Sequence, residues 1–100
     1  VGIDFRGEAP VADEQFTLHQ NQPNPFRGET QISFELPEAG EAQLIISDVA
    51  GKVVKVMKLQ GAKGYNAITL SHSGLPAGIL QYSLRAGQHI ATKRMMILAD

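Results

Sequence analysis

Residues 30–37 read Thr-Gln-Ile-Ser-Phe-Glu-Leu-Pro, so apolar and polar side chains alternate over the whole stretch. Successive side chains of a β-strand point to opposite faces, which places Ile32, Phe34 and Leu36 on one side of the chain. Pro37 has no amide hydrogen for a sheet ladder and ends the pattern. The stretch therefore predicts a half-buried strand with one face on a core.

The same period of two recurs along the chain in short runs separated by Gly, Pro and Asn, with no helical period. Residues 48–52, Asp-Val-Ala-Gly-Lys, are typical of a hairpin turn. The expected strands lie near residues 16–18, 32–36, 42–47, 53–59, 66–70, 79–85 and 89–98. This spacing of short strands predicts an all-β fold, an immunoglobulin-like antiparallel β-sandwich of about seven strands.

The last expected strand is harder to orient than the others. Residues 92–97, Thr-Lys-Arg-Met-Met-Ile, are cleanly apolar on neither face. Three explanations are open: a β-bulge, an edge position in the sheet, or burial of long aliphatic stems on both faces.

Composition limits both the architecture and the chemistry of the chain. Its 100 residues, 43% of them hydrophobic, suit a single domain with one modest core. The absence of cysteine excludes disulfides, thiolate metal sites and a cysteine nucleophile. No apolar run approaches the 18 or more residues that span a bilayer, so we expect no direct membrane insertion.

The start of the chain differs from the rest. Residues 1–14 have no sustained periodicity and no secretory leader pattern. We interpret residues 1–14 as the end of a preceding domain and a linker, and residues 15–100 as one domain, so the chain is expected to be a piece of a longer protein.

Charge is distributed unevenly along the sequence. Residues 1–50 hold nine acids and two bases, whereas residues 51–100 hold seven bases and one acid. One interpretation is mutual charge complementarity between neighbouring strands. The other is a basic face that meets a partner.

The residue types that carry catalysis or bind metals are present but scattered. His19, His72 and His89 lie on different segments without metal-ligand spacing. Ser71 and Ser73 flank one of them without a strained nucleophile turn. Basic side chains are not interleaved with stacking aromatic residues, which argues against nucleic-acid binding. We therefore expect no enzyme activity, metal or cofactor.

Residues 20–26, Gln-Asn-Gln-Pro-Asn-Pro-Phe, form the most distinctive motif. Its prolines predict a rigid, extended connector, with Phe26 as an apolar plug and Asn24 as a side-chain cap for loop amides. The motif resembles the opening of the type A C-terminal sorting domain of the type IX secretion system (Por secretion system), found on proteins exported by bacteria of the Bacteroidetes group.

Further motifs follow in the order of that family and extend the resemblance over about residues 16–98. They are Thr30 to Pro37, Asp48 to Val53, Gly64-Tyr65-Asn66, Leu75 to Gly78, and Ala91 to Met95. Two positions depart from the pattern, since Leu80 replaces a common aromatic residue and Gln22 a frequent tyrosine.

The resemblance implies a module that transits the periplasm, is recognised by the outer-membrane translocon, and is then removed by a sortase-like cysteine protease within the linker before Phe16. The cargo would be secreted, or anchored at the cell surface on anionic lipopolysaccharide. The recognition residues it implies are Pro76, Gly78, Lys93, Arg94 and Met95.

Each of these five residues also has a plainer explanation. Pro76 and Gly78 are ordinary turn formers, Lys93 and Arg94 can be edge-strand charges that keep the protein soluble, and Met95 can fill the core. A structural or adhesive immunoglobulin-like module of a surface protein is the alternative function. The oligomeric state is open, because an uncapped last strand could pair with another chain or with the translocon.

Overall fold

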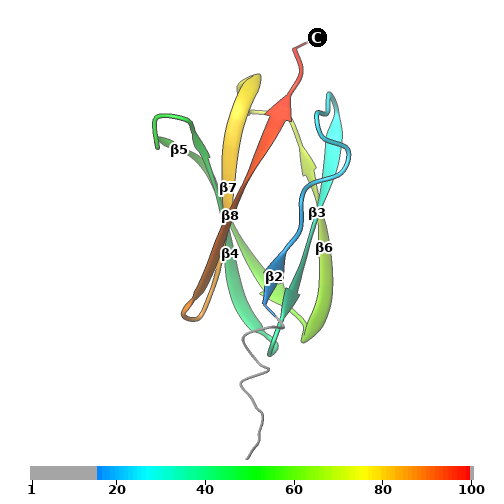
Figure 1. The fold of residues 1–100 in the computed structure, drawn as a ribbon, viewed down its shortest axis with the longest axis vertical. Coiled ribbons are helices and arrows are strands. Elements are labelled where there is room, and N and C mark those ends of the chain that lie inside the picture. Colours follow the sequence, from blue (N-terminus) through cyan, green and yellow to red (C-terminus); the bar gives the residue numbers. More distant parts are fainter. Residues whose placement is uncertain (1–15, 100) are drawn as a thin grey trace, which may run out of the picture.

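The computed structural model describes residues 16–99, which fold into two facing antiparallel β-sheets (Figure 1). One sheet has the strand order β2-β3-β6 and the other the order β5-β4-β7-β8. The strands of the described residues are β2 (Thr17–Leu18), β3 (Glu29–Leu36), β4 (Gly40–Asp48), β5 (Val53–Gly61), β6 (Gly64–Ser71), β7 (Gly78–Ala86) and β8 (His89–Ile97). The predicted all-β, immunoglobulin-like sandwich is confirmed.

Two hairpins and three crossings build this topology. The hairpins β4–β5 and β7–β8 each stay within the four-stranded sheet, whereas the chain changes sheets after β3, β5 and β6. The predicted turn after β4 is present: the Oδ1 atom of Asp48 accepts hydrogen bonds from the amides of Ala50 and Lys52, each at 2.9 Å. That side chain thus satisfies amides that the hairpin leaves unpaired.

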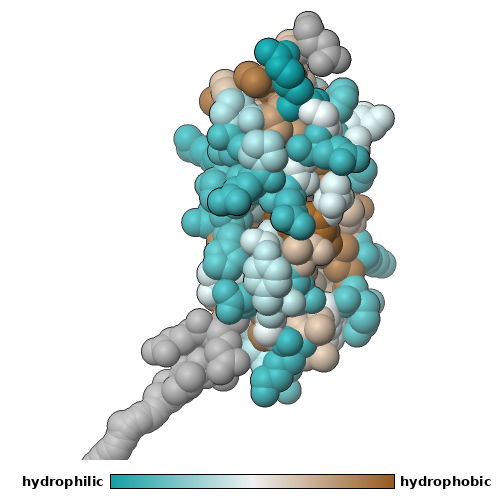
Figure 2. Space-filling model, turned by 90° about the vertical axis from the view of Figure 1, so that its right-hand side faces the viewer, coloured by the Kyte–Doolittle hydropathy of each residue, from teal (hydrophilic) through white to brown (hydrophobic). Residues whose placement is uncertain are grey.

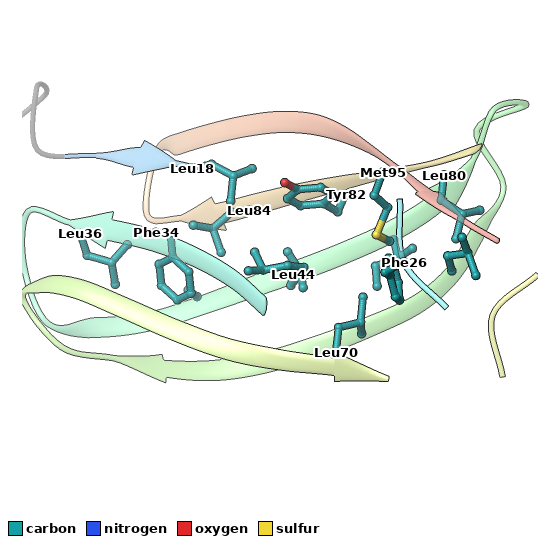
Figure 3. Close-up of a cluster of buried hydrophobic side chains, with 14 residues drawn as sticks. Leu18, Phe26, Phe34, Leu36, Leu44, Leu70, Leu80, Tyr82, Leu84 and Met95 are labelled. Atoms are coloured by element: carbon teal, nitrogen blue, oxygen red, sulfur yellow. The ribbon is translucent and has the colours of Figure 1, made fainter. Parts of the chain in front are cut away.

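The core fills the space between the two sheets (Figure 3). Alternation places one parity of each strand inside, as residues 30–37 predict. Each fully buried leucine or isoleucine side chain contributes roughly 1.5–3 kcal/mol of transfer free energy. The buried hydrophobic side chains of the described residues are Leu18, Phe26, Ile32, Phe34, Leu36, Ala42, Leu44, Ile46, Leu70, Leu80, Tyr82, Leu84, Met95 and Ile97.

The last strand, β8, lies at an edge of the four-stranded sheet and pairs with β7 alone in the ladder. Of the three explanations for its mixed pattern, the edge position is confirmed. Met95 and Ile97 point into the core, whereas Arg94 and Met96, which alternate with them along the strand, are exposed. The register shift in this sheet falls in the β4–β5 pair, between Ile46 and Ser47, rather than in β8.

The mutual charge complementarity that one interpretation predicts between neighbouring strands is not found in the strand registers. No Lys or Arg faces an Asp or Glu in the strand registers of the described residues, where the one salt-bridge contact is His19 with Glu35. Each sheet pairs a strand of residues 1–50 with one or more strands of residues 51–100, but the charged positions are out of register. Gln43 stands opposite both Lys58 and Arg85, and Glu41 stands opposite Gln60.

The predicted preceding domain and linker, residues 1–14, lie outside the described residues. Within the described part, no helix is long and apolar enough to cross a membrane.

Candidate recognition site at the last strand

The segment Gln20–Phe26 lies along the free edge of β8. The amide of Phe26 donates to the carbonyl of Met96 at 3.1 Å, and the amide of Leu98 donates to the carbonyl of Phe26 at 2.8 Å. The side chain of Asn24 accepts a hydrogen bond from the amide of Met96 at 2.9 Å, and the side chain of Gln20 donates to the carbonyl of Arg94. The segment therefore covers the free backbone edge from Arg94 on β8 to Leu98 just after it.

Buried polar contacts hold this segment to both sheets. Asn21 is 1% exposed, and its Nδ2 atom donates to Thr30 Oγ1 on β3 at 3.0 Å and to the carbonyl of Pro23 at 3.2 Å. Its amide donates to the Tyr82 hydroxyl on β7 at 2.8 Å, and that hydroxyl donates to the carbonyl of His19 at 2.8 Å. One tyrosine thus satisfies two backbone groups of the segment.

Sequence reasoning found part of this arrangement. Phe26 is 2% exposed, which confirms the plug, and Asn24 does cap an amide, although that amide belongs to β8 rather than to its own loop. Sequence reasoning did not predict that Asn21 and Tyr82 are hydrogen-bonded to each other. The available signal was the inward parity of Tyr82 beside Leu84, because a buried tyrosine hydroxyl usually has a hydrogen-bond partner.

Burial also changes the acidity of the Tyr82 hydroxyl. Desolvation raises the pKa of Tyr82 above its ordinary value of 10.0, and the hydrogen bond from the Asn21 amide opposes this in part. The hydroxyl is therefore neutral at physiological pH and able to donate to His19.

The turn before β7 and the end of β8 lie at the same end of the four-stranded sheet. Gly78 pairs with Ile97, and Leu80 pairs with Met95. Gly78 has a φ of 113°, a conformation that favours glycine, so the turn alone accounts for its presence. Pro76 is exposed in the loop that leads into β7.

The other three predicted recognition residues differ in accessibility. Lys93 and Arg94 are exposed and, as neighbours on a strand, point to opposite faces of the sheet. Met95 is 1% exposed and points into the core near Phe26 (Figure 3). The structure thus brings Pro76, Gly78 and the end of β8 to one end of the sheet without joining all five residues in one surface. Their part in recognition stays a prediction.

The histidines do not converge. His19 Nε2 lies 3.0 Å from Glu35 Oε2, the ring of His89 stacks on Phe16 with centroids 4.9 Å apart, and the amide of His72 donates to the carbonyl of Gly28. Residues 16–99 contain no group of three or more His, Cys, Asp or Glu side chains placed to hold a metal ion.

A comparison with protein families assigns the chain. A family model described as "Secretion system C-terminal sorting domain" matches residues 22–98, roughly three quarters of the sequence. No curated protein matches the chain significantly. The matched region begins inside the Gln20–Phe26 segment and ends just beyond β8, so it includes the contacts of Asn24 and Phe26 with β8. The chain therefore belongs to the family of type IX secretion C-terminal sorting domains.

Proposed function

We propose that this domain is the part of its protein that the type IX outer-membrane translocon recognises, and that recognition takes the attached cargo across the outer membrane. The family match over residues 22–98 is the observation that carries this proposal. The family is one of sorting signals rather than enzymes, and its domains direct secretion to the cell surface or the medium.

The surface that the translocon reads is centred on the end of the four-stranded sheet. Lys93 and Arg94 offer exposed charged side chains on β8, and Pro76 and Gly78 shape the adjoining turn. Met95 acts by positioning, since its buried side chain fixes β8 against the core. The backbone edge beside these residues is already bonded to the Gln20–Phe26 segment, which favours recognition through side chains.

After transit through the periplasm and across the outer membrane, a sortase-like cysteine protease removes the domain by cutting before Phe16. The cargo is then released or joined to anionic lipopolysaccharide. A cut at this location is compatible with the strands that the structure describes, because the first of them begins at Thr17, after the cut.

An export assay tests the proposal. Residues 1–100 are fused after a periplasmic reporter in a bacterium with a type IX system, and the reporter is measured in the periplasm, on the surface and in the medium. We expect surface or released reporter, and mass spectrometry should place the new terminus before Phe16.

A folded variant then tests the recognition residues. Replacing both Lys93 and Arg94 by alanine should retain the reporter in the periplasm, because both side chains are exposed and their loss leaves the core intact. Replacing the exposed Lys52 and Lys63, which lie in turns, is the matched control and should leave export unchanged. Periplasmic retention of the unaltered fusion despite a folded domain would favour the adhesive module instead.

A further inference from the structure

The outward face of the four-stranded sheet combines exposed apolar and basic side chains. Among the described residues, seven large hydrophobic side chains are exposed, and five of them point outward from this sheet. These five are Val53, Val56, Ile79, Ile90 and Met96, with exposed fractions from 40% to 58%. The exposed bases on the same face are Lys58, Arg85 and Arg94. We call these eight residues the basic–apolar face.

Strand registers place its members in rows across the sheet. Lys58 and Arg85 both stand opposite Gln43 on β4, and Arg85 stands opposite Ile90 on β8. Two strand spacings separate Lys58 from Arg85, a distance of roughly 10 Å. The next row, from β5 to β8, is Val56, Ile45, Ser83 and Thr92, and the row after it is Val53, Ser47, Gln81 and Arg94. The face therefore has two apolar patches separated by polar residues, one on β5 beside Lys58 and one where Ile79 pairs with Met96 beside Arg94.

The charge of this face is unbalanced within the domain. Glu41, at one end of β4, is the one carboxylate that points outward from the four-stranded sheet in the described residues. Lys58, Arg85 and Arg94 form no salt bridge with another described residue. The face is thus positively charged even though the formal net charge of the chain is −1.

The opposite side of the sandwich has a different character. The outward positions of β3 include Glu29 and Glu35, and Tyr65 on β6 is the exposed large hydrophobic residue there. Figure 2 views the molecule from this side and shows mainly hydrophilic residues with smaller hydrophobic areas. Scattered apolar residues are normal on a surface, but their concentration on one sheet face indicates an interaction site.

We propose that the basic–apolar face docks a protein surface of the export machinery in which carboxylates lie beside apolar side chains. This inference rests on the proposed function and extends the recognised surface from β8 across β7 and β4 to β5. Arg and Met are enriched in protein interfaces, and positive side chains beside exposed apolar ones match a partner of opposite charge.

A lipid surface fits the face less well. Membrane-surface binding usually combines a cluster of four or more bases with aromatic anchors at the interface. The basic–apolar face has three separated bases and no aromatic side chain among its members. Its apolar residues are mostly β-branched and lie on a sheet, so they offer a flat surface rather than an inserting wedge.

Charge reversal in the export assay tests the docking face. Lys58→Glu combined with Arg85→Glu should lower the exported reporter about tenfold, because both bases would then repel a carboxylate-rich partner. Val56→Thr combined with Ile90→Thr should lower export as well. The matched control reverses the same number of charges away from the face, Lys52→Glu with Lys63→Glu, and should export normally. Thermal unfolding of each purified variant confirms that it is folded.

The outcomes separate this inference from the proposed function. Normal export of the folded face variants overturns the docking face while sorting itself stands. No export of the unaltered fusion overturns both. A lipid partner is tested by flotation of the purified domain with phosphatidylglycerol–phosphatidylcholine vesicles. Flotation that Lys58→Glu with Arg85→Glu abolishes would overturn the assignment of a protein partner, and absence of flotation supports it.

Discussion

Replacing Tyr82 by phenylalanine tests how the segment beside β8 is held. The substitution keeps the buried ring and removes one oxygen, which leaves the amide of Asn21 and the carbonyl of His19 without their partner. An unsatisfied buried group costs about 1–3 kcal/mol. The Asn21 amide belongs to a buried residue and should contribute the full cost, whereas His19 is partly exposed and water can replace the hydroxyl. We therefore expect the free energy of unfolding to fall by about 2–3 kcal/mol.

Urea denaturation followed by circular dichroism measures this change. The midpoint should move to lower urea while the slope stays the same, because the surface exposed on unfolding barely changes. Tyr65→Phe is the matched control: it removes the same atom from the other tyrosine, which is 64% exposed, and should change stability by less than about 0.5 kcal/mol.

Hydrogen exchange locates the effect. The amides of Asn21 and Phe26 should exchange faster in Tyr82→Phe, whereas the amides inside β4 should change only with global stability. If Tyr82→Phe were as stable as Tyr65→Phe, with unchanged exchange at Asn21, the hydroxyl would not hold the segment and the anchoring argument would be wrong.

Three further outcomes follow from the same contacts. Phe26→Ala should lower the free energy of unfolding by about 3–5 kcal/mol in urea denaturation, because it empties a buried site between the sheets. Gly61→Ala should cost about 1–3 kcal/mol, since the added methyl group would meet the buried Leu36 side chain, whereas Gly40→Ala, with open space around it, should be nearly neutral. Stability should fall as pH rises above about 10, because the raised pKa of Tyr82 makes its hydroxyl lose a proton more readily in the unfolded chain than in the folded domain. Tyr82→Phe, which lacks this hydroxyl, should show a smaller fall in pH-dependent denaturation.

The fold could be predicted because its main signal is local. In residues 30–37 each inward position of the alternating pattern, Ile32, Phe34 and Leu36, is buried in the structure. The same parity rule holds for Leu80 and Leu84 on β7. A period of two can be recognised from neighbouring residues alone, and the turns between strands are marked by their own Gly, Pro and Asp residues.

The arrangement around β8 could not be predicted in the same way, because it depends on sheet order. Asn21 and Tyr82 are separated by 61 positions, and no spacing rule joins them. Lys58 and Arg85 flank the same residue of β4 only because β5 and β7 are both neighbours of that strand. Seven strands allow other orders, and in many of them these two bases would lie apart.

The contact between Gln20–Phe26 and β8 also limits how a partner protein can bind the last strand. On the free edge of β8, the carbonyl of Arg94 and both the amide and the carbonyl of Met96 are already hydrogen-bonded to this segment. A partner cannot add a strand there without displacing the segment. The side chains of Lys93 and Arg94 stay exposed. Under the proposed function, recognition at this part of β8 would therefore use side chains that the folded sandwich orients, and of these two Arg94 is the one that belongs to the basic–apolar face.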